Sequence, residues 1–345
     1  MIGIMLGVLF FLLFITVPIG VSLGISCIAA FSVSDLGSNM IASIDSFSLL
    51  AIPFFMLVGS LMERGGIAKK LVDVAELITG SMPGGLGMAT VVASMFFAAI
   101  SGSGPATAAA IGGIMIGAMT TQGYSKEYSG ALVAAGSTIG PVIPPSIPMI
   151  MYGVTVGVSV SYMFIGSIIP GVLMGIVLMI YNYFISKKRG YVSSRSQAMS
   201  TKEKLNVIKK SIPAILMPVI ILGGIYSGVF TPTESSVIGV VYALIVSVFV
   251  YRSLTWKDFT KSLFDAAITS ATIMILFGAA NTFGRILTMY DVPNMVAAKM
   301  LSVTESKIAI MLMINGALII IGMFIDTISA IVLFAPIFAP IAVAI

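Results

Sequence analysis

The chain has 345 residues, of which 58% are hydrophobic and only 9% are charged, with a formal net charge of +5. A soluble domain carries about 25% charged residues, so this composition excludes a soluble protein and predicts an all-α protein with several membrane-spanning helices. The chain has no histidine and a single cysteine, Cys27. It therefore lacks an intrachain disulfide, and metal sites or nucleophiles that depend on histidine or a thiolate are excluded. We expect neither an enzyme nor an organic cofactor, and the small basic excess requires no nucleic-acid partner.

The chain begins with apolar runs separated by short polar segments. A spanning helix needs about 20 apolar residues, so we predict a first span over 2–30, a loop over 32–48 and a second span over 48–62. The run at 2–30 lacks a basic leading segment, so we interpret it as a span and not as a removed signal peptide. Residues 63–80 mix charged and apolar residues at helical spacing. This pattern predicts an amphipathic helix at the membrane surface or, equally, an ordinary loop helix.

The next apolar segment, 84–120, is interrupted by the sequence SGSGP at residues 101–105. Glycine permits positive φ, and proline fits the first turn of a helix, so we expect one helix to end and another to begin there. Counting membrane crossings against the basic loop described below requires this segment to enter and leave on the cytoplasmic side, as a re-entrant hairpin. The alternatives are small-residue helix packing and a simple kink at Pro105.

A second interruption lies within 59 residues, Tyr128 to Ser186, that carry no charge. A straight helix of that length would be roughly 90 Å long, about three bilayer cores. Four prolines follow Gly140 within eight residues, and proline lacks the N–H that a continuous helix needs. We predict a broken helix over 128–158 and a span over 161–185. The alternative is a kinked helix end.

Residues 186–211 hold eight basic residues and one acidic residue. The positive-inside rule places this segment in the cytoplasm together with the N-terminus, and we predict a connecting span at 212–230. After this span, Thr231, Pro232 and Glu234 have the pattern of a helix start. The basic residues of the loop are Lys187, Lys188, Arg189, Arg195, Lys202, Lys204, Lys209 and Lys210.

The second part of the chain, 231–345, shows the same order of elements as the first part, 1–185. We predict two helices, an amphipathic segment and a hairpin, over 234–251, 263–283, 284–305 and 306–345. Equivalent loops of the two parts differ in their basic residues, which places them on opposite faces of the membrane. The sequence thus predicts an inverted-topology repeat, the architecture of many secondary transporters.

The first hairpin tip offers ligands for a small cation. One arm of a helical hairpin ends in free carbonyl groups, and the other begins with free N–H groups. The carbonyls and the hydroxyls of Ser101, Ser103 and Thr107 can ligate a hard cation such as Na⁺. The N–H groups near Ala106 can receive a substrate carboxylate. Freed carbonyls of the proline-rich break and the hydroxyl of Ser146 can complete the same ion site.

Asp326 is the only charged residue after Lys307. An ionisable residue inside a membrane segment is a functional candidate, so we predict that it binds a cation or carries a proton. Asp is also a good helix N-cap, and capping of the following helix explains it equally well.

Three motifs in order resemble a known family: AAISGSGPATAAAIGGIMIGAMTTQGY, GSTIGPVIPPSIPMIMYG and YSGVFTPTESSVIGVVYALI. They are similar to the large, DctM-like membrane subunit of a TRAP (tripartite ATP-independent periplasmic) transporter, over the whole chain. The resemblance implies a fold like that of the ion transporter superfamily and an elevator mechanism. It implies sodium-driven import of a small organic acid, such as a C4-dicarboxylate or a sialic acid, across the bacterial inner membrane. The implied partners are a small four-helix membrane subunit and a periplasmic substrate-binding protein.

The same resemblance implies where the ions and the substrate bind. One sodium site would be formed by Ser101, Gly102, Ser103, Gly104, Thr107, Gly140, Pro144, Pro145 and Ser146. A second sodium site, half present, would use Gly322, Asp326 and Thr327. The substrate would contact Ser103, Pro105, Ala106, Thr107 and Asp326. Family members continue beyond the position that matches Ile345, so we expect this chain to be truncated.

Two other functions stay open from the sequence. One is a sodium- or proton-coupled dicarboxylate carrier that needs no binding protein. The other is a non-transporting scaffold subunit of a membrane assembly. An intramembrane enzyme fits the available residues less well than either.

Overall fold

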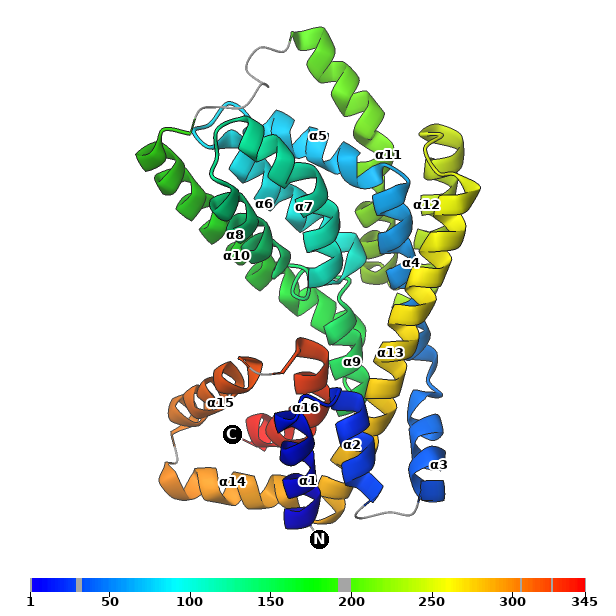
Figure 1. The fold of residues 1–345 in the computed structure, drawn as a ribbon, viewed down its shortest axis with the longest axis vertical. Helices are drawn as coiled ribbons and strands as arrows, with labels where there is room; N and C mark the ends of the chain where they lie inside the picture. Colours follow the sequence, from blue (N-terminus) through cyan, green and yellow to red (C-terminus); the bar gives the residue numbers. More distant parts are fainter. Residues whose placement is uncertain (1, 29–32, 192–199, 305, 324, 345) are drawn as a thin grey trace. The chain divides into compact units, whose positions relative to one another are not determined.

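The structure, a computed structural model, describes residues 2–28, 33–191, 200–304, 306–323 and 325–344. All regular elements in these ranges are helices (Figure 1). The chain divides into two compact units, which we describe in turn. Unit 1 consists of residues Met1–Leu49, Met151–Val158 and Ser270–Ile345, and unit 2 of residues Leu50–Ile150 and Ser159–Thr269.

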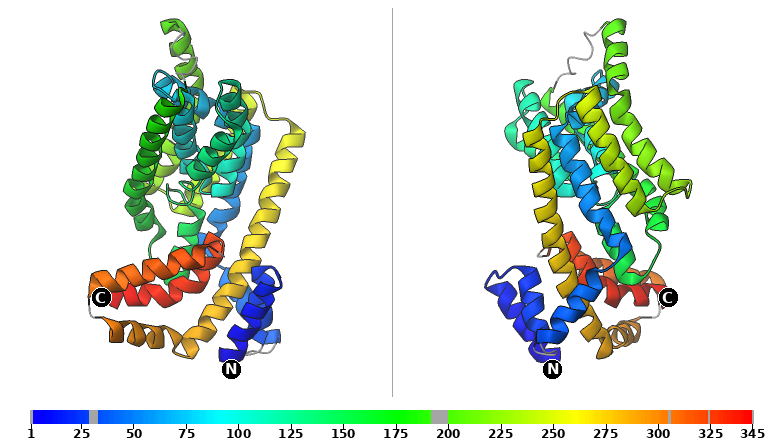
Figure 2. Two further views of the ribbon diagram at one scale, coloured as in Figure 1. Left: turned by 60° about the vertical axis from the view of Figure 1, so that its left-hand side comes forward. Right: turned by 90° about the vertical axis from the view of Figure 1, so that its right-hand side faces the viewer.

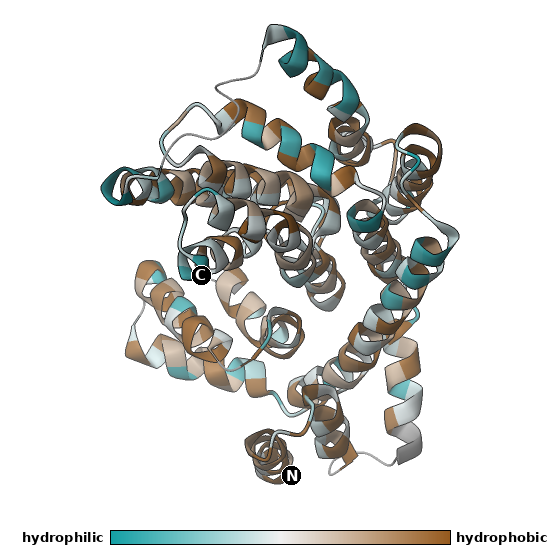
Figure 3. Cartoon of the chain, turned by 45° about the horizontal axis from the view of Figure 1, so that its top comes forward, coloured by the Kyte–Doolittle hydropathy of each residue, from teal (hydrophilic) through white to brown (hydrophobic). Residues whose placement is uncertain are grey.

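Five helices within the described ranges are long and apolar enough to cross a membrane. They run over Phe47–Arg64, Val160–Arg189, Thr201–Tyr226, Pro232–Val250 and Trp256–Met289. Hydrophobic residues occupy most of the ribbon, and strongly hydrophilic residues occupy a few short stretches (Figure 3). An α-helix satisfies its own backbone hydrogen bonds inside a bilayer, so these helices confirm the prediction of a polytopic membrane protein.

Unit 2 begins with α4 (Ala51–Arg64) and α5 (Ile67–Thr79), where the sequence predicts a span and an amphipathic helix. In α5, Ile67, Leu71 and Ala75 are buried at a spacing of four residues, whereas Lys69 on another face is exposed. This one-sided burial confirms the amphipathic helix. Its place at the membrane surface stays a prediction.

The next two helices form the predicted helical hairpin. α6 (Gly85–Ser101) and α7 (Gly104–Thr121) pack side by side and are joined at Gly102 and Ser103 (Figure 1). The following helix, α8 (Lys126–Ser137), packs against both arms. The tip therefore lies where the glycine and proline pattern predicts, while entry of the hairpin into the membrane from one side stays a prediction.

The predicted break in the next segment is also present. α8 ends at Ser137, residues 138–146 form turns, and α9 (Ile147–Val156) begins after them. The span that follows, α10 (Val160–Arg189), is longer than predicted and ends where Gly190 takes the left-handed φ of +69°. Its last turn carries three basic residues, which interact favourably with the carbonyl end of a helix.

The described residues of the segment predicted as a basic loop over 186–211 are largely helical, so that prediction is wrong for them. α10 extends into it, and α11 (Thr201–Tyr226) begins within it, before the predicted connecting span. The cause is a capping box, in which Ser200 and Glu203 satisfy each other's backbone N–H groups. Arg195 lies outside the described residues.

The helix start predicted after α11 is confirmed. Thr231 and Glu234 form a second capping box at the beginning of α12 (Pro232–Ile245). α12 continues as a short π-helix, η3 (Val246–Val250). The next helix, α13 (Trp256–Met289), has 34 residues, and the boundary between the two units falls within it.

In unit 1 the predicted first span over 2–30 is wrong as a single helix. The run forms α1 (Ile2–Phe14) and α2 (Ile19–Ile28), which pack against each other. Thr16 takes a φ of +63°, and Pro18 removes the N–H that a continuous helix would use. Pro18 indicates this break in the sequence, but the continuous apolar run around it favours a single span.

The predicted loop over 32–48 is mostly helical as well. It contains α3 (Val33–Ile44), and the 3₁₀ turn η1 (Phe47–Leu50) leads from it towards α4. The composition of this stretch, with few charges and several polar residues, is typical of a loop. It nevertheless contains no residue that prevents a helix of three turns.

The last elements of unit 1 are α14 (Val292–Val303), α15 (Lys307–Gly322) and α16 (Thr327–Ala344). α15 and α16 lie side by side in both views of Figure 2, and α14 also packs against α16. A small core joins them through Ile310, Ile314 and Ile341. α15 and α16 thus form a helical hairpin where the second hairpin is predicted, and its re-entry into the membrane stays a prediction. The predicted amphipathic segment is shared between the end of α13 and α14.

The order of a helix, a short helix and a helical hairpin occurs twice in the described chain. It appears in α4 to α7 and again in α13 to α16. The same order led to the prediction of an internal repeat. The inverted orientation of its two parts stays a prediction.

Candidate functional site

The tip of the first hairpin is built by glycine and a serine cap. Gly102 ends α6 in the left-handed conformation, with φ +59°, and its N–H donates to the carbonyl of Ala98 at 3.0 Å. Ser103 is extended and caps α7, because its Oγ accepts the N–H of Ala106 at 3.4 Å. Pro105 lies in the first turn of α7, where its missing N–H costs nothing. The chain therefore reverses in two residues.

The break between α8 and α9 is held by local hydrogen bonds. The N–H of Gly140 donates to the carbonyl of Ser137 at 2.9 Å. The buried hydroxyl of Ser146 donates to the carbonyl of Pro141 at 2.6 Å and accepts the N–H of Met149 at 3.3 Å. Ser146 thus closes the turn and also caps the start of α9.

The structure brings the tip and the break together. The N–H of Ile147 donates to the carbonyl of Gly102 at 3.3 Å. A Cβ atom added at Gly102 would lie 2.5 Å from the carbonyl oxygen of Pro145. A Cβ atom added at Gly140 would lie 2.9 Å from the carbonyl oxygen of Ser103 and from the nitrogen of Gly104. Only glycine fits at both positions, because the two backbones touch there.

The hydroxyls of Ser101 and Thr107, on either side of the tip residues Gly102 and Ser103, are buried next to this contact. Ser101 is 1% exposed and Thr107 is fully buried, and their hydroxyl oxygens are 3.3 Å apart. The Thr107 hydroxyl donates to the carbonyl of Ser103 at 2.8 Å. The Ser103 N–H points to the Ser101 hydroxyl at 3.5 Å. Buried hydroxyls need partners, and these find them within the tip.

The prolines leave further oxygen atoms without their usual helical partner. A helical carbonyl accepts the N–H of the residue four positions later, and proline has none. Prolines stand four residues after Ser101, Gly140, Pro141 and Pro144. The site therefore combines hydroxyl and carbonyl oxygens, and none of the predicted residues around it is charged. Such oxygens suit a hard cation.

Exposure divides the predicted residues of this site into two groups. Ser101, Gly102, Thr107, Gly140, Pro144, Pro145 and Ser146 are buried. Ser103, Gly104 and Ala106 are half-buried, and Pro105 is exposed. The residues predicted to contact the substrate are thus mainly the accessible ones, at the N-terminal turn of α7.

Asp326 caps the second hairpin. Its Oδ2 accepts the N–H groups of Ile328 at 3.1 Å and of Ser329 at 3.2 Å, and its Oδ1 accepts a hydrogen bond from the Ser329 hydroxyl. This is the capping role that the sequence leaves open beside an ion-binding role. Asp326 and Thr327 are exposed and belong to unit 1, whereas the first tip belongs to unit 2.

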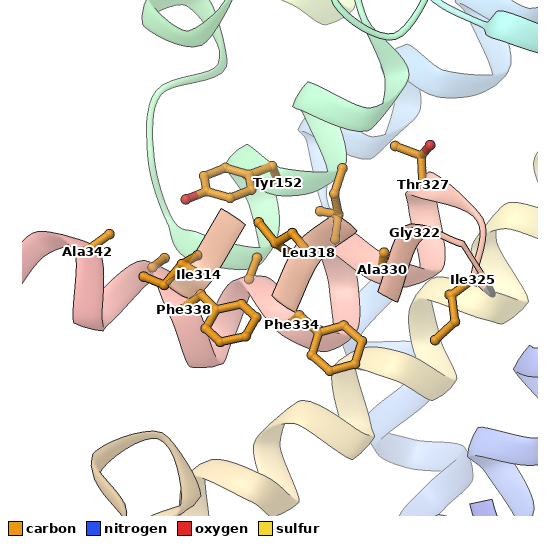
Figure 4. A pocket seen from close by; sticks show the side chains of 13 residues that line it. Tyr152, Ile314, Leu318, Gly322, Ile325, Thr327, Ala330, Phe334, Phe338 and Ala342 are labelled. Carbon is orange, nitrogen blue, oxygen red and sulfur yellow. The ribbon is translucent and has the colours of Figure 1, made fainter. Parts of the chain in front are cut away.

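The other two predicted residues of the second site line an apolar pocket of about 380 Å³. Gly322 and Thr327 lie at its edge, and Tyr152 of α9 closes one side (Figure 4). The remaining walls come from α15, α16 and Ile325 between them. These walls are mainly aliphatic and aromatic, including Phe334 and Phe338. The pocket therefore offers few oxygen ligands for a cation. Within the described residues, no three Asp, Glu, Cys or His side chains gather as a metal site.

Sequence reasoning missed a polar cluster at the opposite end of the first hairpin. It contains Asn182, which is fully buried in α10, and Tyr128, which is buried at the start of α8. A lone asparagine in a long apolar, charge-free run was the available signal, since such residues bond across helices in membranes.

A comparison with known protein families shows which family this chain belongs to. A sequence model described as "Tripartite ATP-independent periplasmic transporter, DctM component" matches residues 6–345, nearly the whole chain. The chain belongs to the DctM family. This confirms the resemblance that the three sequence motifs carry. DctM proteins are transport permeases and not enzymes, in agreement with the residue inventory.

Three relatives of this DctM-family chain show how closely it is related to known permeases. It is 42% identical to the isethionate TRAP transporter permease protein DctMQ of Oleidesulfovibrio alaskensis over 299 residues, 87% of this chain and 47% of that protein. It is 38% identical to the C4-dicarboxylate TRAP transporter large permease protein DctM of Pseudomonas aeruginosa over 311 residues, 90% of this chain and 72% of that protein. It is 35% identical to the sialic acid TRAP transporter large permease protein SiaM of Vibrio cholerae over 307 residues, 89% and 71% respectively.

The chain therefore spans just under half the length of the first relative and just over seven tenths of the other two. Family membership and five helices of spanning length together make it a multi-pass membrane protein.

Proposed function

We propose that this chain is the translocating subunit of a sodium-driven importer of a small organic acid. The observation that carries the proposal is the contact between the first hairpin tip and the α8–α9 break. There, two helix interruptions place hydroxyls and carbonyls side by side in an apolar, uncharged setting. Irregular backbone at membrane depth is tolerated where it lines a functional cavity, and many secondary transporters bind their ions at such places.

A sodium ion fits the chemistry of this site. The proposed ligands come from the hydroxyls of Ser101, Thr107 and Ser146 and from carbonyls of the tip and the break that face a proline in place of a helical N–H. The Pro141 carbonyl is not among them, because it accepts the Ser146 hydroxyl. These groups are neutral, so a bound Na⁺ would give the site a positive charge. An organic anion is then favoured at the adjacent N-terminal turn of α7, where Pro105 and Ala106 are accessible and the helix dipole is positive.

The substrate class follows from the names of the relatives. They name isethionate, C4-dicarboxylates and sialic acid, each of which carries an acidic group. We propose a substrate of this class, with a C4-dicarboxylate or a sialic-acid-like carboxylate as the first to test. The uncharged first tip binds the acid through backbone N–H groups, which recognise a carboxylate but do not distinguish strongly between acids.

The proposed assembly is tripartite, as the family description states. Its other members are a small four-helix membrane subunit and a periplasmic substrate-binding protein. The relative named DctMQ supports close association of the large and small membrane subunits. We further propose that the unit with the first hairpin moves across the membrane as an elevator. The proposed location is the inner membrane, with the N-terminus in the cytoplasm.

Uptake into proteoliposomes tests this function. The complete transporter is reconstituted with its binding protein, and uptake of a labelled organic acid is measured with and without an inward Na⁺ gradient. We expect uptake only with the gradient. Uptake that ignores Na⁺ contradicts the coupling, and uptake without the binding protein supports the alternative carrier that needs none.

A matched pair of substitutions tests the sodium ligands. Thr107→Val removes a buried hydroxyl of the site but keeps the side-chain shape, and we expect the half-saturating Na⁺ concentration to rise about three- to tenfold. Thr121→Val is the control, because the Thr121 hydroxyl bonds the Gly117 carbonyl at the exposed end of the same helix. Equal sodium curves for both variants and the wild type would contradict a ligand role for Thr107.

A further inference from the structure

The base of the first hairpin, far from its tip, is fixed by a buried polar cluster. Asn182 of α10 is fully buried. Its Nδ2 donates to the carbonyl of Gly84 at 3.1 Å, and its Oδ1 accepts the hydroxyl of Tyr128 at 2.9 Å and that of Ser186 at 3.4 Å. One amide therefore joins three places in the chain: the entry to α6, the first turn of α8 and the last part of α10.

The backbone is shaped to this amide. Gly84 has a φ of +70°, and a Cβ atom there would lie 2.1 Å from the Ser186 hydroxyl oxygen. A Cβ atom at Gly87 would lie 2.3 Å from Oδ1 of Asn182. Two glycines thus let α6 approach the asparagine, which is close packing of the kind seen between membrane helices.

Aromatic side chains cover the cluster. The rings of Tyr124 and Tyr191 stack with centroids 4.1 Å apart, and the ring of Tyr128 lies 5.8 Å from that of Tyr191. The guanidinium of Arg189 lies over the Tyr128 ring at 5.2 Å. Tyr191 Oη also accepts the N–H of Ser125 at 3.4 Å. This cover keeps water from the asparagine and strengthens its hydrogen bonds.

The same face of α10 continues towards the proposed ion site. Its buried residues form one stripe, Phe164, Ser167, Gly171, Gly175, Asn182 and Ser186. A Cβ atom at Gly175 would meet Met95 of α6, and one at Gly171 would meet Ile143 in the α8–α9 break. α10 therefore lies along α6 from the base of the hairpin to the break (Figure 1).

We propose that Asn182 is a positioning residue for the ion site at the first tip. It locks the bases of α6 and α8 to α10, so that the far ends of α6 and α8 meet in one register. α6 has 17 residues and is therefore roughly 25 Å long, so a rotation of about 5° at its base displaces the tip by about 2 Å. A shift of that size separates Gly102 from the break. The inference rests on the proposed sodium-coupled transport.

Tyr128→Phe is the variant that tests the lock most gently. It removes the hydrogen bond to Asn182 but keeps the ring, its stacking and the Asn182–Gly84 bond. We expect the half-saturating Na⁺ concentration for uptake by the complete transporter to rise about three- to tenfold. We also expect faster hydrogen exchange at residues 101–107. Tyr162→Phe is the control, because Tyr162 lies on α10, the helix that carries Asn182, and is 78% exposed.

Asn182→Leu should raise the half-saturating Na⁺ concentration more than Tyr128→Phe does. The double variant should have the same Na⁺ dependence as Asn182→Leu alone, because the hydrogen bond between Tyr128 and Asn182 is already lost. A lower unfolding temperature with unchanged sodium dependence and unchanged exchange at the tip would overturn the inference, since it shows a merely structural residue. If wild-type uptake ignores Na⁺, the proposed function fails, and the exchange at residues 101–107 still decides whether Asn182 positions the tip.

Discussion

Two glycines determine how closely the first tip and the break approach. At Gly102 the left-handed φ and the nearby Pro145 carbonyl both exclude a side chain. At Gly140 the conformation is ordinary, and only the neighbouring backbone of Ser103 and Gly104 excludes one. Gly140 is therefore the cleaner probe of the contact, because a substitution there changes packing and not backbone strain.

Gly140→Ala should destabilise the protein by about 1–3 kcal/mol, because the added methyl group forces the break away from the tip. We also expect loss of most sodium-dependent uptake. The measurements are thermal unfolding in detergent and uptake in proteoliposomes. Gly113→Ala in α7 is the control, because a Cβ atom at Gly113 has nothing within 4 Å, and the substitution should be neutral or stabilising. Similar behaviour of the two variants would contradict the close contact.

Asp326 can be tested as a cap and as an ion ligand separately. Asp326→Ala loses the hydrogen bonds to the first turn of α16 and should cost about 1 kcal/mol. Asp326→Asn keeps an equally good cap without the charge, so its unfolding temperature should match the wild type. If Asp326→Asn also keeps full sodium-dependent uptake, a charged role for Asp326 is excluded.

At the scale of the elements, glycine and proline made the interruptions predictable. The SGSGP tip and the proline-rich break occur at the predicted residues, because several glycines and prolines cluster there. A lone proline such as Pro170 in α10 does not end its helix. The helix boundaries were predicted wrongly where they depend on one isolated proline or on a pair of residues that cap a helix together. Pro18 alone divides the first apolar run, and the Ser200–Glu203 capping box starts α11 inside the predicted loop.

The cap of α12 gives a prediction at this scale. Thr231 Oγ1 accepts the N–H of Glu234 at 3.3 Å, and the Glu234 carboxylate accepts the N–H of Thr231 at 2.8 Å. Thr231→Ala should therefore lower the free energy of unfolding by about 1 kcal/mol, whereas Thr231→Ser should keep it. Thermal unfolding of the two variants checks this, and equal losses would point to the methyl group and not to the cap.

At the scale of the whole molecule, the two hairpins differ in character. The first is closely packed against α8 and meets a proline-rich break within unit 2, with buried hydroxyls at the contact. The second packs against α14 within unit 1 and borders an apolar pocket. The repeated order of elements therefore does not imply two identical ion sites.

Sodium itself should stabilise the whole protein if it binds the folded state. A ligand present at 100 times its Kd stabilises by about 2.7 kcal/mol, so the unfolding temperature should rise as NaCl replaces choline chloride at constant ionic strength. The rise should be absent in Gly140→Ala, whose site is opened. An unfolding temperature that does not respond to Na⁺ would contradict sodium binding by the isolated chain.

The sequence by itself determined the class of protein, the family, and the two helix breaks at the SGSGP tip and at the proline-rich segment. Composition sets the solvent that the chain requires, and a cluster of glycines and prolines limits the local backbone, so both effects can be predicted without knowing the tertiary contacts. Only the tertiary structure decided that the tip touches the break, that Asp326 caps α16 and that Asn182 joins the bases of three helices. Those contacts depend on which distant segments pack together. The identity of a glycine, an aspartate or a lone asparagine does not reveal whether its neighbour in space is backbone, water or another helix.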